Sequence, residues 1–419
     1  MPIIGKDYTA GIDEKIFQLK NTFNREFPET LESTIACLSV IAQLKIEDIR
    51  NCFLLILIDA PGSRKTIVLS YFFDIDRITY HTDDWTPKSF VTHAANVPRE
   101  ELEDIDLLPR IIGKTLVIPE LATVFDVPYE KLIQNFGTLT RVLDGQGFRT
   151  ESGVHGSRGY TGVEGDYVFC MLGGVAFIPR LVWKVLGNMG SRTYFYNLPP
   201  SPEDVNYLVE LLKEDFNRKV SICRNAVRSF LINLWEQCPS KVKWQKDKDE
   251  QEALKIIAKA AILLSKLRGT TVIQQIGTEN EKSEYYWEEP VIERPYRANQ
   301  MLYNLARGHA LIHGRKYITT DDLLLVMKVA LSSANSKRVE LLDFLIKNKG
   351  SAKTDEIEKY LNCSKPVAST TMKTLEVIGL VDIIKGKTGE KGGRPPNVAK
   401  LKPAFQWLLT SEYSRFRRR

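Results

Sequence analysis

The chain has 419 residues, which at a typical 100–200 residues per domain suggests two or three domains. With 43% apolar and 26% charged residues it has the composition of an ordinary globular protein, and its longest unbroken apolar run, Cys52–Ile58, is far too short for a membrane helix. The six cysteines are scattered without a Cys-x-x-Cys pair, and no leader pattern stands at the N-terminus. These features exclude a disulfide scaffold and a zinc ribbon, and they predict a cytoplasmic protein without a membrane partner.

The net charge of +6 is unevenly distributed. Residues 338–419 carry 17 Lys or Arg against nine Asp or Glu, a net of +8, so the rest of the chain is close to neutral. A basic C-terminal block indicates an anionic partner, nucleic acid first, although a merely solvated surface has the same composition.

The first two segments predict helices followed by an α/β domain. Residues 1–50 are predicted as an N-terminal helical segment. Within residues 51–200, short apolar runs closed by turn residues alternate with helical patterns such as Tyr129–Leu143. This alternation predicts a doubly wound parallel sheet. The predicted buried strands are Cys52–Ile58, Thr115–Ile118 and Asp166–Leu172, the last closed by Gly173-Gly174.

The second half of the chain predicts two further domains. Residues 201–336 have helix periodicity, with one small hairpin or loop at 271–292, and predict an all-helical domain. Residues 337–419 predict three helices, then two strands joined by the Gly- and Lys-rich loop 385–397. Three helices followed by such a hairpin predict a winged helix-turn-helix.

The segment after the first strand carries a phosphate-binding loop motif with two departures. It matches G-x-x-x-x-G-K-[ST] at Lys65 and Thr66, where Lys neutralises phosphate oxygens and the hydroxyl holds Mg²⁺. Asp59 stands for the first glycine and Arg64 for the second. If Arg64 is a defect, a glycine there should improve nucleotide binding or turnover. The alternative to a nucleotide-binding loop is a strand-to-helix turn that binds no ligand. The predicted ATP-binding residues are Asp59, Ala60, Pro61, Gly62, Ser63, Arg64, Lys65 and Thr66, with Thr66 on Mg²⁺.

A second acidic element follows the strand at 115–118. Glu120 stands where a glutamate polarises the attacking water in phosphoryl-transfer sites of this kind. Pro119 occupies the place of the metal-orienting aspartate. Mg²⁺ binding is therefore weakened, or another residue such as Asp59 coordinates the ion.

This arrangement resembles the AAA+ ATPases over about residues 30–336, and within them the branch of the minichromosome-maintenance helicases. The resemblance implies that Gly187–Phe195 carries an arginine finger, Arg192, which acts in a neighbouring subunit. It implies a second sensor arginine at the start of the last lid helices, with Arg297 the first choice and Arg294 the second. It also implies that the insert Leu143–Gly162 touches DNA through Arg149, His155 and Arg158.

The C-terminal winged helix adds the remaining predicted DNA contacts. Its third helix carries two lysines among small polar residues suited to phosphate contacts, and its wing is basic. Protein–protein contact is the alternative use of such a domain. The predicted DNA-binding residues here are Lys365, Lys373, Lys387, Lys391 and Arg394.

Together these observations predict a DNA-associated AAA+ ATPase that uses ATP and Mg²⁺ for helicase-like or remodelling action. They also predict a homo-oligomer, either a ring, with a hexamer as one form, or a helical assembly. One alternative is a nucleotide-binding switch with weak or no hydrolysis, acting as a loader, initiator or target-selection factor with protein partners. Another is a DNA-bound scaffold whose loop is purely structural.

Overall fold

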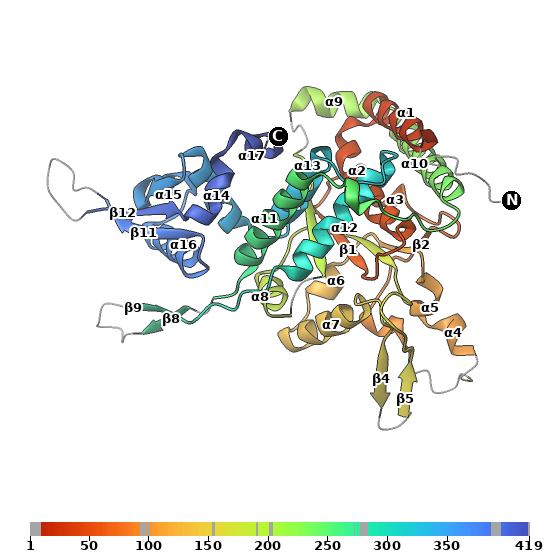
Figure 1. The fold of residues 1–419 in the computed structure, drawn as a ribbon, viewed down its shortest axis with the longest axis horizontal. Helices are drawn as coiled ribbons and strands as arrows, with labels where there is room; N and C mark the ends of the chain where they lie inside the picture. The colour runs from red at the N-terminus through yellow and green to blue at the C-terminus, as the bar shows by residue number, and fades with distance from the viewer. Residues whose placement is uncertain are drawn as a thin grey trace.

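A computed structural model describes the fold (Figure 1). It describes residues 10–92, 98, 101–152, 156–189, 192–200, 204–271, 273–276, 284–386 and 395–417.

The centre of the chain is a five-stranded parallel sheet in the order β2-β3-β6-β1-β7. Its inner strands are almost entirely apolar, with Thr115 a buried exception, because helices cover both faces and leave no solvent-facing row. The strands are β1 (Phe53–Ile58), β2 (Thr79–His81), β3 (Thr115–Ile118), β6 (Cys170–Val175) and β7 (Thr193–Asn197).

Alternate residues of β1 belong to different cores, as the two-residue period of a strand requires. Phe53, Leu55 and Leu57 pack on the side of the amino-terminal and lid helices, whereas Leu54 and Ile56 face the helices inserted between the strands. Those inserted helices are α4 (Leu102–Ile105), α5 (Leu107–Ile111), α6 (Ala122–Phe125), α7 (Tyr129–Val142) and α8 (Arg180–Met189); α3 (Lys65–Ser70) packs on the other face.

The amino-terminal helices and the lid helices form one packed layer. Helix α1 packs on α10, and α2 lies between α12 and the sheet (Figure 1). All residues of α2 from Ser33 to Ala42 are buried. The helices of this layer are α1 (Ala10–Glu26), α2 (Leu31–Ala42), α9 (Val205–Lys213), α10 (Phe216–Gln237), α11 (Gln251–Arg268), α12 (Tyr296–Ile312) and α13 (Leu323–Ser332).

Two antiparallel hairpins project from this body (Figure 1). The first, β4 (Arg149–Ser152) and β5 (Gly156–Gly159), lies between α7 and β6. The second, β8 (Ile273–Ile276) and β9 (Glu284–Trp287), lies between α11 and α12.

The C-terminal part is a small helical unit with a three-stranded antiparallel sheet in the order β10-β12-β11. It is fixed to the lid by Arg338, which donates to the carbonyl oxygens of Leu267 at 2.7 Å and Gly269 at 2.6 Å. Its elements are α14 (Ser336–Lys347), β10 (Ser351–Lys353), α15 (Thr354–Tyr360), α16 (Lys365–Val377), β11 (Val381–Lys385), β12 (Asn397–Leu401) and α17 (Ser411–Arg417).

The predicted parallel α/β core is confirmed, with local corrections. The predicted strand 166–172 is displaced to Cys170–Val175, so Gly173 and Gly174 lie inside it and do not end it. The strands β2 and β7 were not predicted, whereas α1 lies within the predicted N-terminal helical segment. A capping box precedes α13: the Thr319 amide donates to Asp322 at 2.9 Å.

Candidate functional site

The motif at 59–66 lies at the carboxyl end of β1, between the ends of β6 and β7. From β1 the chain runs to β2 at the far edge of the sheet, and it returns later to build β6 and β7 on either side of β1. Ligands of open α/β sheets bind in the crevice at such a switch point, outside the carboxyl ends of the strands. The loop therefore occupies the position where a ligand site is expected.

Lys65 is held inside this loop. Its side-chain nitrogen Nζ donates to the carbonyl oxygens of Asp59 at 2.7 Å and Ala60 at 2.9 Å, and to Ser63 Oγ at 2.8 Å. Burial lowers the pKa of Lys65, and the nearby carboxylates of Asp59 and Glu120 oppose that shift. The loop thus surrounds the Lys65 ammonium group with oxygen atoms. An incoming phosphate would compete with those oxygen atoms for the ammonium group.

Glu120 is brought to the same edge of the sheet by a close crossing of the chain. The turn after β3 passes over β6, where the Leu121 amide donates to the Gly174 oxygen at 2.8 Å. A Cβ atom at Gly173 would lie 2.2 Å from the Leu121 side chain, and one at Gly174 would lie 2.5 Å from the Pro119 oxygen. Gly174 is therefore required for the turn that presents Glu120, whereas a side chain at Gly173 would displace the end of Leu121.

Oxygen atoms suited to Mg²⁺ are present around Lys65. Thr66 is exposed, Asp59 accepts a hydrogen bond from the Ala60 amide at 2.8 Å, and Glu120 accepts one from Ala122 at 2.9 Å. In the described part of the chain, no cluster of three or more His, Cys, Asp or Glu could hold a metal. Mg²⁺ commonly binds through one or two carboxylates together with substrate phosphates, so this donor set fits the ion only as a nucleotide complex.

Arg64 does not behave as a strained substitute for glycine. Its backbone, at φ −84° and ψ 11°, lies outside the left-handed region. Its guanidinium turns away from the loop, hydrogen-bonds the Tyr207 hydroxyl and lies 3.6 Å from a carboxylate oxygen of Glu29. The expectation that Arg64 is a defect is therefore unsupported: the residue ties the loop to α9.

Arg192 and Arg297 are brought together, but far from Lys65. Arg192 precedes Thr193, which pairs with Leu54 near the start of β1, whereas Lys65 follows the end of β1. At about 3.3 Å per residue, the strand separates them by about 13 Å or more.

Arg192 is almost fully buried and forms an ion pair with Asp144 of the same chain, with Nε 2.5 Å from the carboxylate. Burial lowers the pKa of Arg192; Asp144 opposes the shift and nearby Arg297 adds to it. The guanidinium of Arg192 does not project outward in the single chain. A role as a finger therefore requires Asp144 to release it.

The predicted DNA contacts of the first hairpin do not form one patch. Arg149 pairs with Gly159 and Arg158 with Thr150, so the two arginines lie on opposite faces of the ribbon. Arg149 also forms an ion pair with Glu151 at 3.1 Å. His155 lies outside the described residues.

In the C-terminal unit, Lys365 and Lys373 lie on α16 as predicted. Lys365 is exposed, whereas Lys373 is partly buried and donates to Glu376 at 2.6 Å. Lys387, Lys391 and Arg394 lie outside the described residues.

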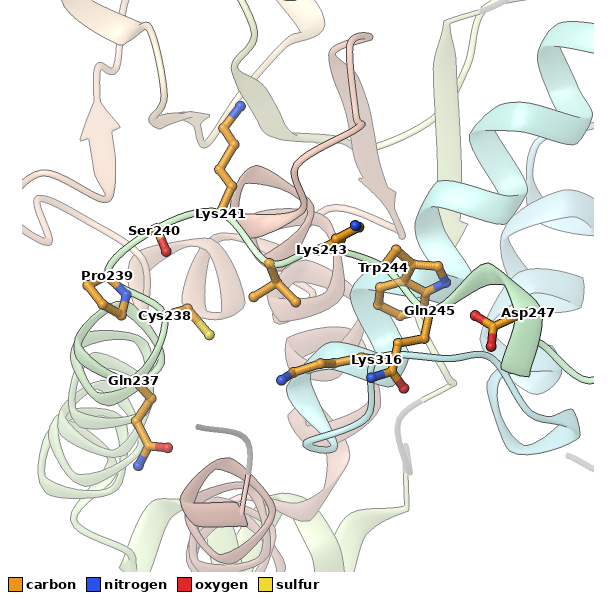
Figure 2. A pocket seen from close by; sticks show the side chains of 11 residues that line it. Gln237, Cys238, Pro239, Ser240, Lys241, Lys243, Trp244, Gln245, Asp247 and Lys316 are labelled. Atoms are coloured by element: carbon orange, nitrogen blue, oxygen red, sulfur yellow. The ribbon is translucent and has the colours of Figure 1, made fainter. Parts of the chain in front are cut away.

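A cavity of about 500 Å³ lies elsewhere, at the carboxyl end of α10 (Figure 2). It contains three lysines, but Lys241 extends away from Lys316, so the charges do not converge on one point. Val242 beside it pairs with Ile46, in the segment that leads into β1. This cavity therefore belongs to the opposite end of the sheet from the loop.

Sequence reasoning missed the partners that fix the arginines. Tyr207, Glu29 and Asp144 contact arginines that lie 143, 35 and 48 positions away along the chain. No local pattern marks them.

Residues 294–333 match the family model of the AAA lid domain. This segment contains α12 and α13 and begins just before Arg297. The match supports an AAA+ ATPase, a class of nucleotide-binding proteins whose domains commonly form oligomers, and the parallel five-stranded sheet is consistent with an AAA+ core and lid. No curated protein matches the chain. None of the helices in the described ranges is long and apolar enough to cross a membrane.

Proposed function

We propose that this protein binds ATP with Mg²⁺ as an AAA+ protein, assembles as a homo-oligomer and couples its nucleotide state to action on DNA. The observation that supports this most is the meeting of Lys65, Asp59 and Glu120 at the carboxyl edge of the sheet. Each side chain has a role that phosphoryl chemistry requires.

At this site Lys65 would exchange its loop carbonyls for the β and γ phosphate oxygens. Thr66 and Asp59 would hold Mg²⁺, and the ion supplies charge neutralisation on the phosphates. Glu120 would orient the attacking water. Gly62, at φ +78° with open space around its Cα, would leave room for close approach of the phosphates.

Arg192 and Arg297 would act together on the nucleotide of a neighbouring subunit. The separation of Arg192 from Lys65 along β1 supports a role outside the site of its own chain. The mutual proximity of Arg192 and Arg297 suits them to one polyphosphate presented from outside. The oligomer would then be part of the active site, since no single chain completes it.

The C-terminal unit would be the DNA contact as a winged helix. Its order of helix, strand, two helices and two strands, with α16 packed on β11, supports that reading. Helix α16 would approach the major groove and the loop between β11 and β12 would form the wing. The β4–β5 hairpin would be a second DNA contact, through one of its faces at a time.

A nucleotide-binding switch with little hydrolysis is the alternative, and Pro119 favours it. A proline cannot replace a metal-orienting carboxylate, and Gly173-Gly174 places no polar side chain beside Glu120. ATP turnover measured with and without DNA decides between motor and switch.

The nucleotide site is tested by Lys65→Ala. Loss of charge-assisted hydrogen bonds of about 1.5–3 kcal/mol should weaken ATP binding by about 10- to 100-fold in titration calorimetry. Lys131→Ala, an exposed lysine on α7, is the matched control and should bind like the wild type. Thermal unfolding of both variants checks that the fold is retained. Equal ATP affinity in a folded Lys65→Ala protein would overturn the assignment.

A further inference from the structure

The second hairpin and the C-terminal unit meet around a cavity of about 450 Å³. Trp287 at the end of β9 forms one wall, and Ser369, Thr370 and Lys373 from one face of α16 form another. Lys385 closes it at the base of the β11–β12 hairpin. We call this cavity the notch; it joins the lid to the C-terminal unit, and Lys373 is the one member of it that was predicted from the sequence as a DNA contact.

The two lysines of the notch are held in place by neighbours. Lys373 donates to one oxygen of Glu376 at 2.6 Å, and the other oxygen of Glu376 accepts the Ile383 amide at 3.1 Å. Lys385 donates to Asn397 Oδ1 at 2.8 Å. The ammonium groups are therefore positioned before any ligand arrives, and Glu376 offsets only one of the two positive charges.

The chemistry of the walls suits a nucleotide. An indole can stack on a base, hydroxyl groups and ammonium groups can contact phosphates, and a volume of this size lies in the usual range for small-ligand pockets. Among the described lining residues, Trp287, Pro366 and Ile383 supply apolar side chains, and the others carry hydroxyl, ammonium, carboxyl or amide groups.

We propose that the notch receives one unpaired base of a DNA strand, which stacks on Trp287 while Lys373 and Lys385 contact the adjacent phosphates. The proposal rests on the proposed contact between the C-terminal unit and DNA, and it adds that this DNA carries an unpaired base. A base paired within a duplex cannot enter a pocket without leaving the stack. The protein should therefore prefer single-stranded or frayed DNA to a blunt duplex.

Trp287→Ala tests the notch in the full-length protein. Stacking is worth about 1–3 kcal/mol per base, so binding of a labelled 20-nucleotide oligothymidine should weaken by about 5- to 100-fold in fluorescence anisotropy. Binding of a blunt duplex of the same length should hardly change. Trp287→Phe should keep most of the affinity because it keeps an aromatic face.

The matched control is Tyr296→Ala, an aromatic residue nine positions further along the chain that is 79% exposed and not part of the notch. It should bind both DNAs like the wild type. Lys385→Gln should reduce the slope of log affinity against log salt for the single strand by about 0.7, the value of one phosphate contact.

The outcomes separate the notch from the DNA role. If the wild type binds neither DNA at low salt, the proposed DNA function is wrong. If the wild type binds the single strand and folded Trp287→Ala binds it equally well, the notch proposal alone is overturned.

Discussion

Arg64 stands directly before Lys65, at a position where glycine is usual in phosphate-binding loops, yet its backbone is unstrained. Its guanidinium lies 5.2 Å from the centre of the Phe27 ring and contacts Tyr207 and Glu29. These contacts join the loop to α9 and to the turn before α2. Arg64 departs from the sequence motif, yet its side chain stabilises the packing of the loop against the neighbouring helices.

Arg64→Gly should therefore lower the free energy of unfolding by about 1–3 kcal/mol, since charged hydrogen bonds to Tyr207 and Glu29 are lost and a flexible residue enters the loop. Urea denaturation measures the change. Tyr207→Phe removes only the hydroxyl and should reproduce part of the loss. Unchanged stability together with tighter ATP binding in the Arg64→Gly protein would contradict this and restore the reading of Arg64 as a defect.

The residue types of the candidate nucleotide site could be predicted from the sequence, but their orientations could not. Lys65 and Glu120 follow apolar strands, and the parallel sheet brings the ends of those strands to one edge. The ion pair of Arg192 with Asp144 depends on how α7 ends against the start of β7, which no spacing rule encodes. The sequence therefore indicated an exposed Arg192 where the structure has a buried one.

Among the elements, α2 and α12 cross in close contact. A Cβ atom at Gly308 would lie 1.9 Å from the Ser39 carbonyl oxygen and 3.1 Å from the Gln43 side chain. The glycine lets the two helices touch through their backbones. This contact fixes the lid helix that begins at Tyr296 against the layer that covers the sheet.

Gly308→Ala should destabilise the protein by about 1–3 kcal/mol through overpacking, although alanine is intrinsically the better helix former by about 1 kcal/mol. Chemical denaturation gives the free energy of unfolding. Asn299→Ala on the exposed side of the same helix is the control and should change it by less than about 0.5 kcal/mol. A neutral or stabilising effect at 308 would show that the two helices can separate without cost.

The elements that escaped prediction share a physical cause. Strand β2 has three residues, too few for a periodic signal, and β7 is a short aromatic segment. Helix α1 lies within the predicted helical segment 1–50, but its bounds were not predicted: it has mostly polar residues and buries only a narrow stripe, including Ile12, Ile16 and Phe23, against its neighbours. Such elements form because the rest of the molecule supplies a surface for them. The long apolar strands and the helices α11 and α12, by contrast, can be predicted from their own apolar runs and helical periodicity.

For the whole molecule, the proposed role of Arg192 and Arg297 in a neighbouring subunit would make ATP turnover a property of the assembly. Arg192→Ala should lower ATP turnover by at least tenfold while leaving ATP affinity nearly intact, since a finger acting in trans is worth about 10³–10⁵ in rate in related systems. Mixing it with Lys65→Ala protein should restore part of the turnover, because each chain supplies the half-site that the other lacks. Full turnover by strictly monomeric wild-type protein would refute the shared site.

The burial of α2 also has a consequence for how the chain is made. Its ten buried residues, from Ser33 to Ala42, pack against α12, which begins at Tyr296 and is synthesised much later. At about 5–20 residues per second, a ribosome needs on the order of 10–50 s to travel that far. During this time the side of α2 that packs on α12 has no permanent partner. Completion of the core therefore waits for the far end of the lid, and nascent or truncated chains that stop before it expose the surface most prone to aggregation.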